Sequence, residues 1–232
     1  MGKSDDVKLL GAWQSPVTLR ARIALNIKSV DYEFIAESFE PKSQLLLQSN
    51  PVHQKVPVFF HKDKPICESL VIVQYVDEVW SSASPILPSD PYERAIARFW
   101  AAFIDDKWYP AMRSIRGAKG EDERNKRIQE VREGLLLLED AFQKSSKGND
   151  FFGGDQIGYL DIAFGSFLGW LRVVEVSNRV KLLDQENTPG LVKWAEKFCA
   201  HIAVKDIMPE TEKLHEFAKM LWAKMAAAST PK

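Results

Sequence analysis

The sequence has little cysteine and no histidine pattern that suits a metal. Its 232 residues include only two cysteines, Cys67 and Cys199, which are too far apart to suggest a disulfide framework and which suit a reducing compartment. The four histidines share no metal-ligand spacing with one another or with the cysteines. We therefore expect no metal site.

Long apolar runs and an excess of charge are also missing. No apolar run reaches the roughly 20 residues that a transmembrane helix needs. The first residues, MGKSDD, lack the apolar core of a secretory signal and the Ser or Thr of a myristoylation motif. The formal net charge of -1 supplies no broad positive field for nucleic acid. These absences predict a cytosolic protein with neither a membrane nor a nucleic-acid partner.

Apolar and charged residues occur at 45% and 27%, the proportions of an ordinary soluble globular protein. The length is enough for one large domain or two small ones. Seven tryptophans are more than a core of this size requires. Such rings either fill the core or line a ligand cleft, and their number leaves both interpretations open.

Strand and helix patterns alternate over about the first 80 residues. We expect a strand over 7–10, a helix over 18–28, a strand over 31–36, a short helix over 40–47, strands over 56–61 and 65–67, and a helix over 68–80. The last two strands are joined by the short turn Lys62-Asp63-Lys64, so they must be antiparallel. This β-α-β-α-β-β-α order is that of a thioredoxin-like α+β domain, which we assign to residues 1–82.

The second half of the chain has only helical periodicity. Residues 83–90 are short, small and proline-bearing, as in an interdomain linker. Beyond them, helices are expected over 91–115, 123–143, 159–174, 191–203 and 210–225. Residues 91–232 are therefore predicted to form an all-α domain.

The turn between the first strand and the first helix holds a candidate functional serine. Pro16 suits the first position of a helix, which puts Ser15 at the N-cap. The Ser15 oxygen either accepts a backbone N–H or faces a ligand, since a helix N-terminus favours an anion there. This motif alone leaves both interpretations open.

Three further features lie in the same half of the chain. Val56-Pro57 is either an ordinary trans bond or a cis bond that leaves the Val56 backbone free to pair with an extended peptide. Glu68-Ser69 is either a plain helix cap or a carboxylate and a hydroxyl that hold the amino and carboxylate groups of a ligand. Lys42 and Lys55 either face solvent or neutralise a second carboxylate of that ligand.

Together these motifs resemble the glutathione transferases and, within them, the plant tau class. The resemblance runs from about Val7 to Met225 and is carried by Trp13-Gln14-Ser15-Pro16, Arg20-Ala21-Arg22-Ile23-Ala24-Leu25, Asn50-Pro51-Val52-His53-Gln54-Lys55-Val56-Pro57-Val58, Pro65-Ile66-Cys67-Glu68-Ser69-Leu70, Phe151-Phe152-Gly153-Gly154-Asp155 and Asp161-Ile162-Ala163. It implies a homodimer that conjugates glutathione to hydrophobic electrophiles in detoxification and stress response. It also implies peroxidase activity toward organic hydroperoxides, and no cofactor, because glutathione is a co-substrate.

The resemblance also implies roles for individual residues. The glutathione site would consist of the catalytic Ser15, which donates a hydrogen bond to the sulfur, Glu68 on the γ-glutamyl amino group, Ser69 on its carboxylate, the Val56 backbone on the cysteinyl unit, and Lys42 and Lys55 on the glycyl carboxylate. The hydrophobic substrate would lie against Trp13, Gln14, Arg20, Tyr109, Arg113 and Trp170, with Trp222 as a lid.

Two positions depart from the family pattern. Gln54 stands where a lysine is usual, which removes a positive charge near the glycyl end. Gly158 stands where many relatives have Ser or Thr, which leaves Asp161 to form half of a capping box, a structural role. Cys67 lies at a strand end rather than at the active-site turn, so a glutaredoxin-like thiol transferase is disfavoured.

Two rival functions fit the same motifs. One is a non-catalytic carrier of hydrophobic small molecules, although a pure carrier has no need of a hydroxyl that stabilises a thiolate. The other is a structural interaction module of transferase fold, which would not bind glutathione.

Overall fold

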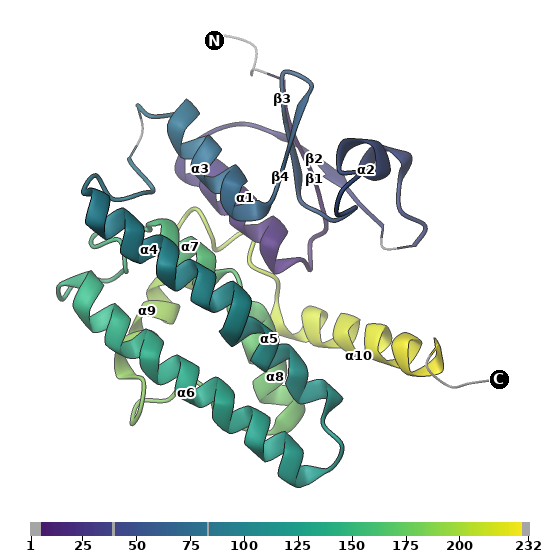
Figure 1. Cartoon of the computed structure of the whole chain (residues 1–232), viewed down its shortest axis with the longest axis vertical. Helices are drawn as coiled ribbons and strands as arrows, with labels where there is room; N and C mark the ends of the chain where they lie inside the picture. The colour runs from purple at the N-terminus through teal and green to yellow at the C-terminus, as the bar shows by residue number, and fades with distance from the viewer. Residues whose placement is uncertain (1–5, 39, 83, 229–232) are drawn as a thin grey trace.

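The computed structural model describes residues 6–38, 40–82 and 84–228, with a sheet domain followed by a helical one (Figure 1). The sheet domain comprises β1 (Val7–Gly11), α1 (Pro16–Ile27), β2 (Glu33–Ala36), α2 (Gln44–Ser49), β3 (Val58–His61), β4 (Lys64–Cys67) and α3 (Ser69–Val79). This order confirms the predicted thioredoxin-like arrangement. Two strands are shorter than predicted, since β2 and β3 each begin two residues later than the sequence pattern suggests, whereas β1 and β4 are each one residue longer.

The sheet has the strand order β2-β1-β3-β4, with β1 parallel to β2 and antiparallel to β3. Successive side chains of a strand face opposite sides, and both sides of β1 are covered. Leu9 belongs to the large core that includes α1 and α3, whereas Leu10 packs with Leu46 of α2. The unbroken apolar run of β1 therefore reflects a strand buried on both faces.

The helical domain comprises α4 (Pro91–Phe103), the π-helical turn η1 (Ile104–Trp108), α5 (Tyr109–Ser114), the 3-10 turn η2 (Ile115–Gly117), α6 (Glu121–Ser146), α7 (Tyr159–Gly165), α8 (Leu168–Asn178), α9 (Pro189–Ala200) and α10 (Thr211–Ala228). An all-helical second domain was predicted and is confirmed. Among the described residues, no helix is both long and apolar enough to cross a lipid bilayer.

Two helices predicted as continuous, over 91–115 and 159–174, are interrupted. In the first, Pro110 has no N–H to donate to the carbonyl one turn earlier, and the chain widens there into the π-helical turn η1. In the second, the backbone N–H of Phe167 donates to the carbonyl of Phe164 and not to that of Ala163, as a continuing α-helix would require. The Ala163 carbonyl accepts hydrogen bonds from the Arg20 guanidinium and the Ser166 hydroxyl instead. A tertiary contact thus ends α7, and helical periodicity does not reveal it.

The segment between the two domains is fixed by a buried ion pair. The Lys28 ammonium, with no exposed side-chain surface, lies 2.7 Å from Asp77 and donates to the carbonyl of Ser84 at 2.7 Å. Asp77 also accepts the backbone N–H groups of Ile86 and Leu87 at 2.8 and 2.9 Å. The linker predicted from composition is therefore held against α1 and α3 by specific hydrogen bonds.

Asp161 organises the start of α7. Its fully buried carboxylate accepts the backbone N–H groups of Phe152, Gly153 and Gly158 at 2.8, 2.9 and 2.8 Å, and the Trp194 indole N–H at 2.7 Å. The bond to Gly158 is the half capping box expected from the sequence. Burial raises the pKa of Asp161 to about 6, and the four donors act in the opposite direction.

We expect Asp161→Asn to lower the free energy of unfolding at pH 7 by about 3 kcal/mol, because the new amide cannot accept all four bonds. The pKa of Asp161 is raised on folding, so the wild type gains stability as the pH falls from about 6 toward 4, by about 3 kcal/mol at most. Asparagine lacks this gain, so urea unfolding should show a larger difference between the two proteins near pH 4.5 than at pH 7.

Asp184→Asn is the matched control. The pKa of Asp184 is lowered by the backbone N–H of Asn187, so this carboxylate stays ionised at both pH values. The difference in unfolding free energy between the wild type and Asp184→Asn should therefore be no larger near pH 4.5 than at pH 7. A difference for Asp161→Asn that shrinks near pH 4.5 would contradict the prediction.

Candidate active site

Ser15 lies where β1 ends and α1 begins. Its Oγ accepts the backbone N–H of Thr18 at 3.2 Å, so Ser15 is the N-cap of α1. The hydroxyl proton is not used in that bond and can be donated elsewhere. Gly11 allows the tight approach of strand to helix, since a Cβ there would lie 2.3 Å from the Thr18 methyl carbon. The half-buried serine is therefore positioned at the start of α1 with its hydroxyl proton available.

The loop before β3 is shaped by Asn50. This buried residue donates from its amide to the carbonyl of Lys55 at 2.9 Å and accepts the backbone N–H of His53 at 3.1 Å. The Val56-Pro57 bond is cis, one of the two alternatives that the sequence left open. Val56 lies two residues before the first residue of β3 and is therefore outside its ladder. Lys42 and Lys55 are both exposed.

Glu68 and Ser69 stand at the start of α3 but do not form a plain cap. The Glu68 side chain makes no capping hydrogen bond, and its φ of 69° lies in a region that residues other than glycine seldom adopt. Such strain costs about 1–3 kcal/mol and is found most often at functional sites. The exposed Glu68 carboxylate lies 3.6 Å from the His53 ring. Ser69 is buried and follows it directly.

Arg20 was predicted to line the hydrophobic pocket, and this is wrong. Its side chain is buried, and its five N–H groups donate five hydrogen bonds: two to the Asp105 carboxylate at 2.9 and 2.6 Å, and one each to the Ser69 hydroxyl, the Ser166 hydroxyl and the Ala163 carbonyl. Because α1, α3, η1 and the α7–α8 junction converge on one guanidinium, Arg20 joins the two domains beside Ser69.

Asp105 was not identified from the sequence. It lies in η1, where the π-helical widening occurs, and its carboxylate remains about one-third exposed at the edge of the site. The only sequence signal was Pro110, which indicates an irregular helix just downstream. His53 was also missed as a neighbour of Glu68, because loop 50–55 has no periodicity that predicts its path.

Cys67 has the properties of an unreactive thiol. Burial and the Glu68 charge beside it raise the pKa of this thiol, which disfavours the thiolate. Its Sγ lies 3.6 Å from the Ser49 carbonyl. Both observations agree with the preference for Ser15 over Cys67.

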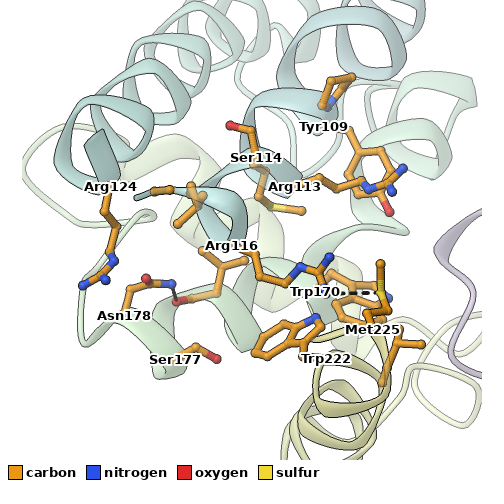
Figure 2. Close-up of a pocket in the computed structure, with 16 residues that line it drawn as sticks. Tyr109, Arg113, Ser114, Arg116, Arg124, Trp170, Ser177, Asn178, Trp222 and Met225 are labelled. Carbon is orange, nitrogen blue, oxygen red and sulfur yellow. Dashed lines mark hydrogen bonds between the residues drawn. The ribbon is translucent and has the colours of Figure 1, made fainter. Parts of the chain in front are cut away.

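A cavity of 920 Å³ opens among α5, η2, α8 and α10 (Figure 2). It is lined by Tyr109, Pro110, Met112, Arg113, Ser114, Ile115, Arg116, Ala118, Arg124, Trp170, Val174, Ser177, Asn178, Leu221, Trp222 and Met225. Its size suits a drug-sized ligand. Tyr109, Arg113, Trp170 and Trp222 were predicted for the pocket and do line it.

Trp13 and Gln14 adjoin this cavity without lining it. The Trp170 indole N–H donates to the backbone carbonyl of Gln14 at 2.8 Å, and the Trp13 ring meets Phe217 of α10 edge-on at 5.7 Å. Gln14 is buried. Since Ser15 follows Gln14, the Trp170 end of the cavity lies next to the serine.

Tyr109 connects the cavity to Arg20. Its ring stacks on Phe167 with centroids 4.1 Å apart, and the Arg20 guanidinium lies 4.8 Å from the centroid of the same Phe167 ring. Burial raises the pKa of Tyr109, which keeps its hydroxyl neutral. The cavity therefore presents aromatic faces and a neutral hydroxyl at the end near Ser15.

These features, together with sequence comparison, define the class. The sequence model of the glutathione S-transferase N-terminal domain matches residues 5–78, and that of the C-terminal domain matches residues 99–201. Glutathione S-transferase U17 of Arabidopsis thaliana is 59% identical over 97% of this chain and 99% of that protein. The chain belongs to the glutathione S-transferase family.

Its class within the family follows from the same comparisons. The tau-class glutathione S-transferase of mango, Mangifera indica, has a TM-score of 0.92 and 62% identity, covering 94% of this chain and all of that one. A rice glutathione S-transferase solved in complex with glutathione has a TM-score of 0.86 and 34% identity over 95% of this chain and all of that one. The chain is a tau-class member of the family.

Arg20→Lys should lower the free energy of unfolding by about 3 kcal/mol. Lysine retains the charge but offers three donors in place of a planar fork, so at least two buried acceptors lose their partner. Arg22→Lys is the control, because Arg22 is only half-buried and donates one hydrogen bond, to Tyr32. Urea unfolding should show a cost for Arg22→Lys of about 1 kcal/mol or less. Equal costs for the two variants would refute the assigned role of Arg20.

Proposed function

We propose that this chain conjugates the glutathione thiolate to hydrophobic electrophiles in the cytosol. The observation that carries the proposal is the Ser15 hydroxyl, whose oxygen is bonded to the Thr18 N–H and whose proton is left to donate. It lies at a helix N-terminus and follows Gln14, whose carbonyl accepts the Trp170 indole N–H beside the apolar cavity. This combination suits a bound sulfur anion and an apolar acceptor.

The rest of the glutathione molecule would bind to residues of the sheet domain near Ser15. Glu68 would hold the γ-glutamyl amino group and Ser69 its carboxylate, while the Val56 backbone would pair with the cysteinyl unit. Lys42 and Lys55 would neutralise the glycyl carboxylate. Three observations support this arrangement. The Glu68 carboxylate makes no capping hydrogen bond, and Ser69 stands at the first position of α3. The rice relative was solved in complex with glutathione.

The role of Ser15 is to favour thiolate over thiol. Lowering a thiol pKa by about two units requires roughly 2.7 kcal/mol of differential interaction, which a hydroxyl donor and a helix N-terminus can supply. The thiol proton passes to solvent. The sulfur then forms a bond to the electrophilic carbon, and the leaving group departs with the bonding electron pair. No cofactor takes part, because glutathione is itself a reactant.

A non-catalytic carrier is the alternative from another class. The cavity alone suits either function, but a carrier needs no hydroxyl donor at the sulfur. Peroxidase activity toward organic hydroperoxides would use the same thiolate and belongs to the same proposal.

Ser15→Ala should lower kcat/KM for a chlorodinitrobenzene by about 100-fold near pH 6.5 and should raise the apparent pKa of the pH–rate profile by about two units. Both effects follow from loss of the donor to the sulfur. Steady-state conjugation measured across pH tests them. An inactive wild type, or a variant with unchanged kcat/KM, would contradict the proposal.

Asp90→Ala is the control for the lost helix cap. Asp90 accepts the backbone N–H of Glu93 at 2.9 Å at the start of α4, so its removal costs about 1 kcal/mol of stability in the same way. It lies outside the site. Its pH–rate profile should match that of the wild type.

The proposal includes a homodimer formed through α3 and α4. These helices are joined by hydrogen bonds from Arg98 to Gln74 at 2.8 and 3.0 Å. Tyr92 and Phe99 are seven residues apart on one side of α4 and are 72% and 60% exposed, and Val71 of α3 is 51% exposed. Large exposed aromatic side chains in one region are typical of a protein interface.

Phe99→Glu should convert the dimer to a monomer, because an unpaired charge would be buried at the interface. Light scattering coupled to size-exclusion chromatography would give the mass of each species. Leu137→Glu is the control, since Leu137 is 51% exposed on α6 and should leave the dimer intact. A monomeric wild type, or a dimeric Phe99→Glu, would exclude this interface.

A further inference from the structure

Trp170 of α8 holds the main chain immediately before Ser15. Its indole N–H donates to the Gln14 carbonyl at 2.8 Å, although 156 residues separate the two in sequence. That carbonyl belongs to the peptide group between Gln14 and Ser15, and the N–H of the same group donates to the Ala12 carbonyl at 3.0 Å. The peptide group that leads into Ser15 is therefore fixed at both ends, by the sheet domain at its N–H and by the helical domain at its oxygen.

Hydrogen-bond donors are scarce around Gln14. Among the residues that the structure describes, no hydrogen bond other than that from Trp170 reaches the Gln14 carbonyl. The side-chain oxygen of Gln14 is also buried and has no partner within the described part of the chain. A buried carbonyl that loses its donor is left unsatisfied, so the peptide group reorients where it can. The bond from Trp170 therefore decides how this peptide group is oriented.

Trp170 also belongs to the packed wall of the cavity described above. Its ring packs against the large core and against a smaller cluster that joins α8 to α10 and consists of Val173, Leu214 and Ala218. Because its N–H is already bonded to Gln14, Trp170 offers a ligand in the cavity its ring surface and not a hydrogen-bond donor.

We propose that Trp170 is a positioning residue for the thiolate chemistry, which acts through the peptide group between Gln14 and Ser15. Its hydrogen bond keeps Ser15 where the serine hydroxyl donates to the sulfur. A side chain of the helical domain thereby sets the geometry of a donor in the sheet domain. The inference rests on the proposed function, because the sulfur that Ser15 would stabilise is that of glutathione.

The position of Ser15 matters because a hydrogen bond weakens steeply as its angle departs from linearity. A misplacement of about 1 Å at a reacting group can lower a rate by about 100-fold. Ser15 keeps its bond to the Thr18 N–H without Trp170, since both residues belong to the sheet domain. Loss of the Trp170 bond should therefore misplace the hydroxyl donor without removing it, and the effect should be smaller than that of Ser15→Ala.

Trp170→Phe keeps an aromatic ring in the cavity and removes the N–H donor. It should raise the apparent pKa of the pH–rate profile for a chlorodinitrobenzene by about one unit, and so lower kcat/KM by about tenfold at pH values below that pKa. Titration of the bound thiolate by its ultraviolet absorbance, with glutathione and no electrophile, should show the same shift. A residue that only walls the cavity would change KM for the electrophile and would leave this titration unmoved.

Trp170→His is the rescue variant. The Nε2–H of histidine is two bonds from Cγ, as the indole N–H of tryptophan is, so the donor to Gln14 is kept in the neutral and in the charged ring. The fused six-membered ring is lost. This variant should titrate close to the wild-type pKa and should have a raised KM for the apolar electrophile, which is the opposite pattern to that of Trp170→Phe.

Trp222→Phe is the matched control. Trp222 lines the same cavity from α10, and its indole N–H has no hydrogen-bond partner in the part of the chain that the structure describes. This variant trims the cavity wall by the same amount. It should raise KM for the electrophile and leave the thiolate titration at the wild-type pKa.

A Trp170→Phe titration that coincides with that of the wild type would overturn the proposal. An equal shift in Trp222→Phe, or a shift in Trp170→His as large as that in Trp170→Phe, would also overturn it. Failure of the transferase proposal is distinguishable, because the wild type would then conjugate no electrophile or Ser15→Ala would leave the pKa unchanged. In that case the role of Trp170 fails with it.

Discussion

A guanidinium that is buried away from water needs a hydrogen-bond acceptor for each of its five N–H donors. Arg20 of α1 finds these acceptors on α3, on η1 and at the end of α7. Desolvating such a charge costs several kcal/mol unless it is paired and fully hydrogen-bonded. The five hydrogen bonds from Arg20 reach Asp105 of η1, Ser69 of α3, and Ala163 and Ser166 at the end of α7. The relative position of the two domains at the active site follows from this requirement.

The hydrogen bonds of Arg20 also coincide with two irregular places in the helical domain, the end of α7 and the π-helical turn η1. The Ala163 carbonyl accepts a hydrogen bond from Arg20 and not from the backbone N–H one turn later, so α7 ends at Gly165 and α8 begins at Leu168. The π-helical turn carries Asp105, and Tyr109 follows it directly, with its ring stacked on Phe167. Irregular helical turns at this place therefore serve to aim side chains, as π-helical segments in other proteins often do. Arg20 therefore supports both the sheet domain beside Ser69 and the helical segment that precedes the apolar cavity.

Site geometry also favours Ser15 over Cys67 as the proposed hydrogen-bond donor to the sulfur. Ser15 stands at a helix N-terminus with a proton to donate, whereas burial and the charge of Glu68 disfavour the Cys67 thiolate. The cavity near Ser15 adds the aromatic surface of Tyr109, Trp170 and Trp222. The proposed apolar acceptor fits such a surface.

The sequence by itself determined the strand and helix order, the family, and the local turn that holds Ser15, because these depend on short-range periodicity, caps and proline geometry. It also indicated that Tyr109, Arg113, Trp170 and Trp222 share a pocket, through resemblance to relatives. Only the tertiary structure decided that Arg20 is a buried support rather than a pocket wall, that Asp105 is its partner, and where α7 ends. Those outcomes depend on hydrogen bonds between residues 49 to 146 positions apart, which no local pattern encodes.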